Sequence, residues 1–513
     1  MIGATKRYLR YGLGVYRFLK RPLSLAECYA IVRERVENRD GNFLAMLERG
    51  VYSNLRSPYR RLLEHARCEL GDVESMVKSD GLEATLRKLS EAGVYITVEE
   101  YKGKKPVERN GLSFVVHPED FDNPEIRIDD SVEAVSGATR SKGIRTHLGF
   151  DFLTHEAAVD GVFFDGLGLN GATYALYHDF VEGLLKAGKR GVSPQRWFFP
   201  VSSNKNKLRC FCTVAAGRML GYSFAWPELI DSGCAWKVAE WLAKKKSLGF
   251  CIVVSTIASA AVRVCLAAGK RGLDISGTVF ITGAEPMTAA RQRQIEVAGC
   301  RALVRYVSSD MGSIGLSCAT STGDDTHFLN GHLAAIRQPR LVGSSGLVID
   351  ALRFTTLLAT APKIFINAEN GDYARLATRR CGCQFDELGL TDHLSHIRSF
   401  EKLTSEGMTF FAGDLVRIVE EVLPVKFGGS PLDYQAVEEE TENGLSHFTM
   451  LVSPKVGEVD EEKLVQTIFE ELKKGGANNR RMGNIWEEAG TVRVRREEPQ
   501  PTRGGKIFPF QVR

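Results

Sequence analysis

The pattern of apolar and polar positions is helical over the first part of the chain. Residues 1 to about 100 repeat apolar positions with the period of a helix, for example over 25–34 and 82–92. Such a stretch predicts a mostly helical lead-in to whatever follows it.

From about residue 110 the pattern changes to short apolar runs separated by glycine-rich turns and helical stretches. The runs 250–255 and 277–281 predict buried strands, and 288–298 predicts a helix that Gly299 ends. Strands that alternate with helices favour an α/β architecture.

Near residue 399 the pattern changes again, to a small α+β module. It contains two predicted helices and three predicted strands, at 415–423, 461–472, 434–440, 447–452 and 491–494. We therefore expect the fold class α/β, with a large N-terminal α/β body of several subdomains and a small C-terminal α+β cap domain. The predicted boundaries are 1–398 for the body, of which 1–100 is the helical lead-in, and 399–513 for the cap.

Composition adds little to this picture. The 513 residues include 67 Lys and Arg against 63 Asp and Glu, a net charge of +4, and 43% are hydrophobic. These values exclude a disordered or polybasic chain and give no reason to expect nucleic acid as a partner.

No segment approaches the roughly 18 apolar residues of a membrane span, and residues 1–22 are basic without an apolar core. We expect a cytoplasmic protein with no stable membrane insertion, whose basic N-terminal helix packs on the body; weak contact with a membrane surface is the alternative. Eleven cysteines, an odd number, argue against a disulfide framework. A homodimer is an open alternative.

The first candidate motif follows a predicted strand at 132–135. It is a loop of small, hydroxyl and basic residues, Ser136, Gly137, Thr139, Ser141 and Lys142. Backbone N–H groups, hydroxyls and a lysine in such a loop can bind phosphate oxygens. The loop lacks P-loop spacing, and a plain turn is the alternative.

The second motif consists of two segments that lie about twenty residues apart in the sequence. Gly283, Ala284 and Glu285 come after a predicted strand and before a helix, a usual ligand position in an α/β sheet. Downstream, Tyr306 offers a flat face for a base, Ser308 and Ser309 offer phosphate donors, and Asp310 offers an oxygen ligand for Mg²⁺. A loop with a capping Asp is the alternative.

Two further motifs lie towards the C-terminus. In Asn370-Gly371-Asp372 the carboxylate of Asp372 can accept hydrogen bonds from both hydroxyls of a ribose, although a turn is the simpler interpretation. Near the end, Lys506 follows two glycines, so it could reach a neighbouring site or be a solvated surface charge.

In their order these motifs resemble those of the adenylate-forming superfamily, within it the phenylacetate–CoA ligase branch. The resemblance spans roughly residues 130–510 and is weakest over the first 100. The family's Tyr-Gly-Ser-Thr-Glu segment is similar to 306–310, with Val307 and Asp310 as departures. Its Arg-Gly pair is matched at Gly407, with Glu406 in place of the arginine, and its Thr-x-x-Gly-Lys motif at 502–506.

The resemblance implies a role for each motif. The 136–143 loop would bind the triphosphate, and the 283–285 and 306–309 segments the rest of the nucleotide. Asp372 and Arg398 would bind the ribose, Asp310 would bind Mg²⁺, and Lys506 would be the catalytic lysine. Such enzymes are ATP-dependent acid–thiol ligases: they make an acyl-adenylate, and the cap domain then rotates about a hinge, here near Ser399 to Lys402. We expect ATP, Mg²⁺, a carboxylic acid and coenzyme A as cofactors and substrates.

The identity of the acyl acceptor is open. The leading interpretation is coenzyme A; the alternative is a specialised biosynthetic enzyme that passes the acyl group to a carrier protein, a protein cysteine or an amine. A third interpretation is a binding protein that has lost catalysis, against which the joint presence of Asp372, Arg398 and Lys506 argues. The sequence does not identify the acid, and Phe224, Trp226, Trp236 and Phe250 are candidates to line its pocket.

Three cysteines and a histidine form a candidate metal site. They are Cys318, His327, Cys381 and Cys383, two pairs that lie after the second and third motifs. A Cys₃His set is typical of structural zinc, and phenylacetate–CoA ligase relatives can carry zinc on similarly placed residues. Unrelated thiols and a surface histidine are the alternative.

Overall fold

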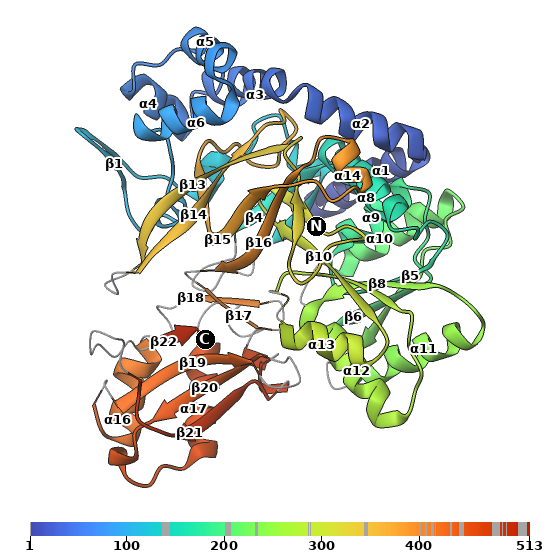
Figure 1. Ribbon diagram of the computed structural model, residues 1–513, viewed down its shortest axis with the longest axis vertical. Coiled ribbons are helices and arrows are strands. Elements are labelled where there is room, and N and C mark those ends of the chain that lie inside the picture. The colour runs from blue at the N-terminus through green and yellow to red at the C-terminus, as the bar shows by residue number, and fades with distance from the viewer. Residues whose placement is uncertain are drawn as a thin grey trace.

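A computed structural model describes most of the chain (Figure 1). The described residues are 2–135, 144–200, 207–230, 234–285, 287, 289–342, 347–399, 402–405, 408–411, 415, 417–430, 433–440, 446–474, 483–484, 486–488, 490–500 and 510–512.

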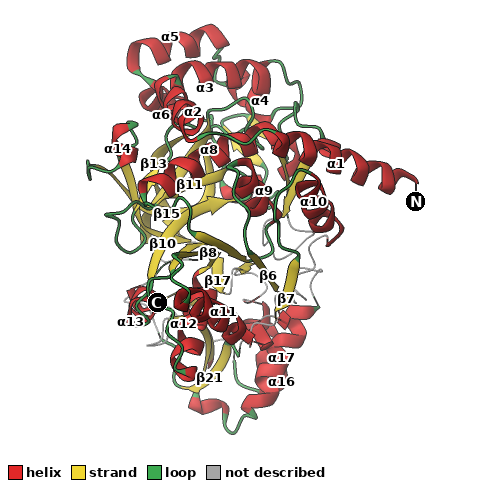
Figure 2. Cartoon of the chain, turned by 90° about the vertical axis from the view of Figure 1, so that its right-hand side faces the viewer, coloured by secondary structure: helices red, strands yellow, loops and turns green. Residues whose placement is uncertain are grey.

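The lead-in is helical, as predicted, and lies along one side of the body (Figure 1). Its helices are α1 (Ile2–Lys20), α2 (Leu25–Glu37), α3 (Arg39–Leu47), a π-helical turn (Glu48–Tyr52), α4 (Pro58–His65), α5 (Leu70–Asp80), α6 (Leu82–Glu91) and α7 (Val98–Tyr101). Local sequence explains where two of them begin, because Ser24 with Glu27 and Thr97 with Glu100 form capping boxes. The start of α1 extends away from the body in Figure 2.

Short elements connect the lead-in to the body. They are the hairpin β1 (Val107–Arg109) and β2 (Leu112–Phe114), two 3₁₀ turns (Pro118–Phe121 and Ile128–Asp130), and the pair β3 (Ser131–Val135) and β4 (Arg145–Gly149). Strand β4 leads directly into the buried helix α8 (Phe150–Gly166).

Half of the central sheet is parallel and doubly wound. Its elements are β5 (Thr173–Tyr177), α9 (Val181–Lys189), β6 (Arg196–Pro200), α10 (Lys207–Met219), β7 (Pro227–Ile230), α11 (Ala235–Ser247), β8 (Ile252–Ile257), α12 (Ala258–Arg271), β9 (Val279–Gly283), α13 (Ala289–Val297) and β10 (Arg301–Ser308). Alternate residues of β5 enter different cores: Tyr174 and Leu176 pack towards α8 and α9, and Ala175 and Tyr177 towards α11 and α12. This alternation is the period of two expected of a strand with helices on both faces.

The other half of the sheet is antiparallel. It continues from β10 through β11 (Gly312–Leu316), β12 (Thr326–Phe328), β13 (Leu333–Val342), β14 (Leu347–Thr356), β15 (Ala368–Thr378) and β16 (Asp392–Ser399), with α14 (Gln384–Glu387) before β16. Twelve strands of the described chain join in the order β13-β14-β15-β16-β12-β11-β10-β9-β8-β5-β6-β7. The sequence did not predict this long antiparallel half.

The C-terminal module is a separate small sheet with its own core (Figure 1). After β17 (Lys402–Ser405) and β18 (Met408–Phe411) come a π-helical turn (Ile418–Val422), α16 (Leu423–Phe427), β19 (Tyr434–Glu440), β20 (Ser446–Val452), a 3₁₀ turn (Pro454–Val456), α17 (Glu461–Lys473), β21 (Val492–Arg496) and β22 (Phe510–Val512). The sheet order is β21-β20-β19-β22. The predicted fold class, a large α/β body with a small α+β module, is therefore confirmed.

Most predicted elements of both parts lie within two residues of their observed bounds. One differs in part: in the helix expected over 415–423, Leu415 and Arg417 are α-helical, but Ile418–Val422 form a π-helical turn, and α16 continues to Phe427. Pro424 stands at the start of α16 and has no N–H to donate to the helical ladder, which disturbs it locally. Among the described helices, none is both long and apolar enough to cross a membrane.

A buried charge cluster attaches the lead-in to the sheet. The Arg109 guanidinium forms an ion pair with Glu100 at 2.8 Å, with both side chains over 90% buried. It also lies 3.7 Å from the ring centroid of Tyr95, whose ring Arg353 of β14 contacts at 4.0 Å. The Tyr95 ring of the lead-in thus contacts two guanidinium groups, that of Arg109 on β1 and that of Arg353 on β14.

We predict that Arg109→Ala lowers the stability of the protein by about 3–5 kcal/mol, because it leaves the Glu100 carboxylate buried without its ion partner. The midpoint of urea unfolding should shift accordingly. Arg60→Ala is the matched control: Arg60 pairs with Glu64 at 3.0 Å on the surface of α4, and such pairs contribute about 0–1 kcal/mol. Equal shifts for the two variants would contradict the prediction.

Candidate functional site

The parallel strands bring several predicted site residues to one edge of the sheet. Chain order reverses between β5 and β8, which pair with each other, and ligands of open α/β sheets bind beyond the strand ends at such a point. Gly283–Glu285 follow the neighbouring β9, and Ser309–Asp310 follow β10. The second motif therefore lies where the fold favours a ligand.

Gly283 is required by the close approach of two strands. A Cβ atom at this position would lie 3.0 Å from the main-chain oxygen of Arg305 on β10. Ala284 follows with a positive φ of 66° and is exposed. The backbone thus turns sharply at the end of β9, as expected of a strand end that faces a ligand.

Glu285 has a role inside the protein. Its carboxylate accepts hydrogen bonds from the Ser259 N–H at 2.6 Å and from the Ser259 hydroxyl at 3.1 Å. It also forms an ion pair with Arg291 at 3.3 Å, in which both side chains are buried. Glu285 therefore caps the start of α12 and ties it to α13, a role that the sequence did not reveal.

Tyr306 and Asp372 are brought together across more than sixty residues. The Tyr306 hydroxyl donates to Asp372 Oδ2 at 2.8 Å, and the Asn370 amide donates to the Tyr306 oxygen at 2.7 Å. Asn370 also accepts from the Asp372 N–H at 3.0 Å. Burial and the neighbouring Asp372 charge raise the pKa of Tyr306 well above its usual value, so its hydroxyl stays protonated and can donate.

Hydrogen bonds from two side chains fix the Asp310 carboxylate. Its Oδ1 accepts from Thr146 at 2.5 Å and its Oδ2 from the Tyr101 hydroxyl at 2.9 Å, while the Asp310 N–H donates to Ser308 Oγ at 3.3 Å. Ser309, between Ser308 and Asp310 in the sequence, is half-buried. Each carboxylate oxygen has two acceptor positions, so one on each oxygen is left for a cation. The arrangement fits an oriented monodentate Mg²⁺ ligand.

In the pairing of β15 with β16, Arg398 lies opposite Tyr373, the residue that follows Asp372 in β15. Its guanidinium donates to Asp324 Oδ2 at 2.8 Å. The structure therefore brings Arg398 and Asp372 onto adjacent strands and pairs Arg398 with an acid that the sequence did not single out.

Six predicted residues lie outside the described part of the chain: Ser136, Gly137, Thr139, Ser141, Lys142 and Lys506. The structure describes the residues that follow the 136–143 loop and those that follow the segment with Lys506. Thr146, which binds Asp310, comes soon after the first, and β22, which pairs with β19, comes soon after Lys506. Gly407 and Glu406 are also outside it.

The site contains residues that sequence reasoning missed. His178 and Asp179 directly follow β5 at the switch point and are each only 7% exposed. A Tyr-His-Asp run after a buried strand was the available signal. Tyr101 and Thr146 carry no such signal, because their link to Asp310 spans 209 and 164 residues.

The candidate acyl-pocket aromatics do not form one group. Phe224 is fully buried in the core, whereas Trp226 and Phe250 are 42% and 47% exposed. Trp236 is half-buried, with the Arg271 guanidinium 4.1 Å from its ring. These four residues therefore do not define a pocket for the acid.

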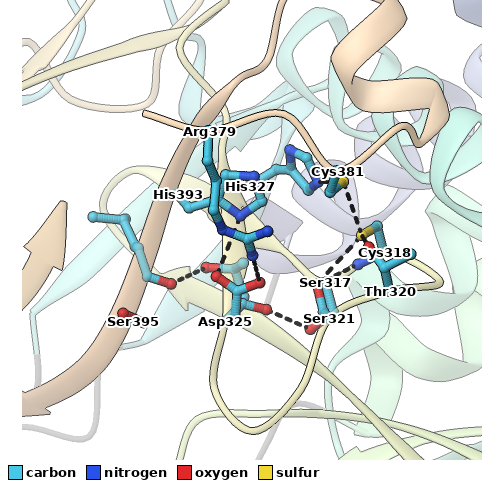
Figure 3. A network of polar contacts seen from close by, with 12 residues as sticks. Ser317, Cys318, Thr320, Ser321, Asp325, His327, Arg379, Cys381, His393 and Ser395 are labelled. Atoms are coloured by element: carbon cyan, nitrogen blue, oxygen red, sulfur yellow. Dashed lines mark hydrogen bonds and ion pairs between the residues drawn. The ribbon is translucent and has the colours of Figure 1, made fainter. Parts of the chain in front are cut away.

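The four predicted metal ligands converge, and Figure 3 shows three of them, Cys318, His327 and Cys381. Cys318, His327, Cys381 and Cys383 place their ligand atoms within 4.8 Å of one another. Cys381 Sγ lies 3.7 Å from Cys318 Sγ, and His327 Nε2 lies 3.4 Å and 3.2 Å from the sulfurs of Cys381 and Cys383. Ligand atoms of a tetrahedral zinc with bonds of about 2.0–2.3 Å lie about 3.5–3.8 Å apart. The Cys318–Cys381 distance lies in this range, and the two distances to His327 are about 0.1–0.3 Å shorter, so small shifts of the side chains would accommodate such an ion.

The surroundings of this Cys₃His cluster also suit a metal. His327 Nδ1 lies 2.6 Å from the Leu390 carbonyl oxygen. If Nδ1 carries the proton, it donates there and leaves the lone pair of Nε2 for an ion. The Asp386 carboxylate accepts from the N–H groups of Cys381 at 2.5 Å and Gly382 at 2.6 Å. Hydrogen bonds, above all with Cys383, lower the pKa of the Cys318 thiol, which favours a thiolate.

No family model and no curated protein matches the sequence. The structure is similar to that of 2-hydroxyisobutyryl-CoA ligase in complex with 2-HIB-AMP and CoA in the thioesterification state. That match has a TM-score of 0.58 and 13% identity, and covers 96% of this chain and 91% of the other. The same ligase in the postadenylation state gives a TM-score of 0.46 at 14% identity, over 94% of this chain and 89% of the other. The match with a TM-score of 0.58 shows that the protein shares its fold with this CoA ligase.

Proposed function

We propose that the protein is an AMP-forming acid–thiol ligase, which activates a carboxylic acid with ATP and transfers the acyl group to coenzyme A. The observation that carries the proposal is the hydrogen-bonded set of Tyr306, Asn370 and Asp372. It combines an aromatic ring with an oriented carboxylate, which are the groups needed for an adenine and a ribose. The 2-hydroxyisobutyryl-CoA ligase of the same fold was captured with an acyl-AMP and CoA.

The reaction would have two steps. First, a carboxylate oxygen bonds to the α-phosphorus of ATP while the bond to the pyrophosphate oxygen breaks. Then the thiol sulfur bonds to the acyl carbon, the acyl–oxygen bond to AMP breaks, and the thiol proton passes to solvent. Such phosphoryl chemistry needs positioning and charge neutralisation more than covalent help from the protein.

The residues would divide this work. Asp372 and Arg398 would orient the ribose, the 136–143 loop would hold the triphosphate, and Lys506 would stabilise the charge developing on the α-phosphate and carboxylate oxygens. When bound, Mg²⁺ on Asp310 would neutralise charge on the departing pyrophosphate. Thr146 and Tyr101 fix the direction of that carboxylate.

Two domains would alternate between the steps. We assign residues 1–398 to the adenylation body and 399–513 to the cap that carries Lys506, with the hinge near 399–402. Of the hinge, residues 400 and 401 lie outside the described chain. Structural zinc in the Cys₃His cluster and membership of the phenylacetate–CoA ligase branch belong to the same proposal.

The acceptor can be tested by product analysis. With ATP and an activated acid, we expect an acyl-CoA thioester and AMP release that depends on coenzyme A. AMP release that does not require coenzyme A would favour a carrier protein, a protein cysteine or an amine as acceptor. Chromatography of the quenched reaction distinguishes these outcomes.

The nucleotide site makes a separate prediction. Asp372→Asn should raise the Kd for AMP by about tenfold or more, because hydrogen bonds to a charged group contribute about 1.5–3 kcal/mol. Calorimetric titration measures it. Asp350→Asn is the matched control, since Asp350 is exposed and lies 3.9 Å from Arg337, in the β13–β14 pair. An unchanged Kd for Asp372→Asn would contradict the assignment of the ribose site.

A further inference from the structure

Asp324 holds three consecutive residues of β16. Its Oδ1 accepts from the His396 N–H at 2.9 Å, and its Oδ2 accepts from the Ile397 N–H at 3.0 Å. The same Oδ2 accepts from the Arg398 guanidinium at 2.8 Å. The Asp324 side chain is 13% exposed and the Arg398 side chain 35%, so the acid is the more buried partner of the ion pair.

This carboxylate lies at an irregularity of the sheet. Arg375 pairs with Ser395, but Tyr373 pairs with Arg398, so β16 carries one more residue than β15 between these pairs. The extra residue makes a β-bulge, and His396 adopts a positive φ of 55° there. Bulges redirect the side chains that follow them. Here the following side chain is Arg398.

A second acid, Asp325, directly follows Asp324 and contacts His393 of β16 (Figure 3). Asp325 Oδ1 lies 3.2 Å from His393 Nδ1, and Asp325 forms an ion pair with Arg379. The His393 ring lies with its centroid 4.0 Å from that of the metal ligand His327, and these two histidines pair across β12 and β16. The Asp324–Asp325 turn therefore lies between the Cys₃His cluster and Arg398.

We propose that Asp324 is a positioning residue for nucleotide binding: it fixes the bulge of β16 and the Arg398 guanidinium, on the strand that pairs with the strand of the ribose residue Asp372. This inference rests on the proposed function, because it requires Arg398 to contact the ribose. It adds a residue that contacts no nucleotide yet sets the affinity for one. A rotamer-rich arginine held in place beforehand loses less entropy on binding.

The test is a double-mutant cycle on AMP affinity. Asp324→Asn keeps the size of the side chain, but it removes the charge that pairs with Arg398, and its single oxygen can accept from only one of the two backbone N–H groups. We expect the Kd for AMP to rise about five- to tenfold in Asp324→Asn and at least as much in Arg398→Gln. The double variant should bind no more weakly than Arg398→Gln alone, because both changes remove one interaction.

Other readouts separate positioning from folding. Metal content of Asp324→Asn should match that of the unmodified protein, its thermal midpoint should stay above the temperature of the AMP titration, and Asp350→Asn should leave AMP affinity unchanged. The inference would be overturned if the losses of AMP affinity in the two single variants added in the double variant. It would also be overturned if Asp324→Asn left the Kd for AMP unchanged while Arg398→Gln raised it. Either result would leave the proposed function standing. If Arg398→Gln itself binds AMP normally, the ribose role of Arg398 fails and the inference fails with it.

Discussion

Replacing Lys506 with alanine should reduce acyl-adenylate formation by about 100-fold or more, while attack of the thiol on a preformed adenylate continues at nearly its normal rate. The size follows from the loss of one charged group that stabilises the transition state, which typically costs about 10²–10³-fold in rate. The selectivity follows from the proposed domain rotation, in which the cap presents Lys506 only for the first step. Lys506 lies outside the described residues, but β22, which follows it, belongs to the sheet of the C-terminal module.

The two half-reactions can be measured separately. Pyrophosphate exchange follows adenylation, and thioester formation from synthetic acyl-AMP follows the second step. Lys426→Ala is the control, because Lys426 is an exposed lysine on α16 of the same module. If Lys506→Ala slows both half-reactions equally, the two-conformation account is wrong for this protein.

Removing one ligand of the Cys₃His cluster should release the metal and lower stability. We expect about one zinc per chain in the intact protein and little in Cys381→Ser, with the free energy of unfolding reduced by several kcal/mol, because binding energy at a structural site is folding energy. Elemental analysis and thermal unfolding measure the two effects. Since the cluster adjoins the Asp324–Asp325 turn through His393, metal loss should also weaken AMP binding.

Cys251→Ser is the matched control for this prediction, since Cys251 is an exposed cysteine outside the cluster. It should leave metal content and stability unchanged. If Ser or Ala substitution of all four ligands left metal content unchanged, the metal site would be refuted. A thermal midpoint that does not move when metal is lost would refute only its structural role.

Local patterns in the sequence predict the parts of the fold that are built from local contacts. Strand β19 has the predicted bounds, Tyr434–Glu440, and its first four residues are all buried. The capped lead-in helices and the helix closed by Gly299 follow from local patterns as well. The Cys₃His cluster is also predicted, because its residues are typical zinc ligands and because phenylacetate–CoA ligase relatives can carry zinc on similarly placed residues; the Cys-x-Cys spacing alone is weak evidence.

Contacts between distant segments could not be predicted in this way. The antiparallel strands β13–β16 are defined by pairing with one another, and the short segments carry no signal of which partner they choose. The Tyr101 and Thr146 hydroxyls and the Asp324 carboxylate look like ordinary surface residues in the sequence. Their roles arise only when the sheet brings them to Asp310 and Arg398.

If the protein joins AMP to a carboxylic acid, it should catalyse acid-dependent exchange of labelled pyrophosphate into ATP. Across a panel of aliphatic, hydroxy and aromatic acids, without any thiol, we expect exchange with at least one acid. That exchange should be lost in Lys506→Ala and strongly reduced in Asp372→Asn, but retained in Asp350→Asn. Absence of exchange with every acid, from folded protein that binds AMP, would contradict this activity and favour a protein that binds nucleotide without catalysis.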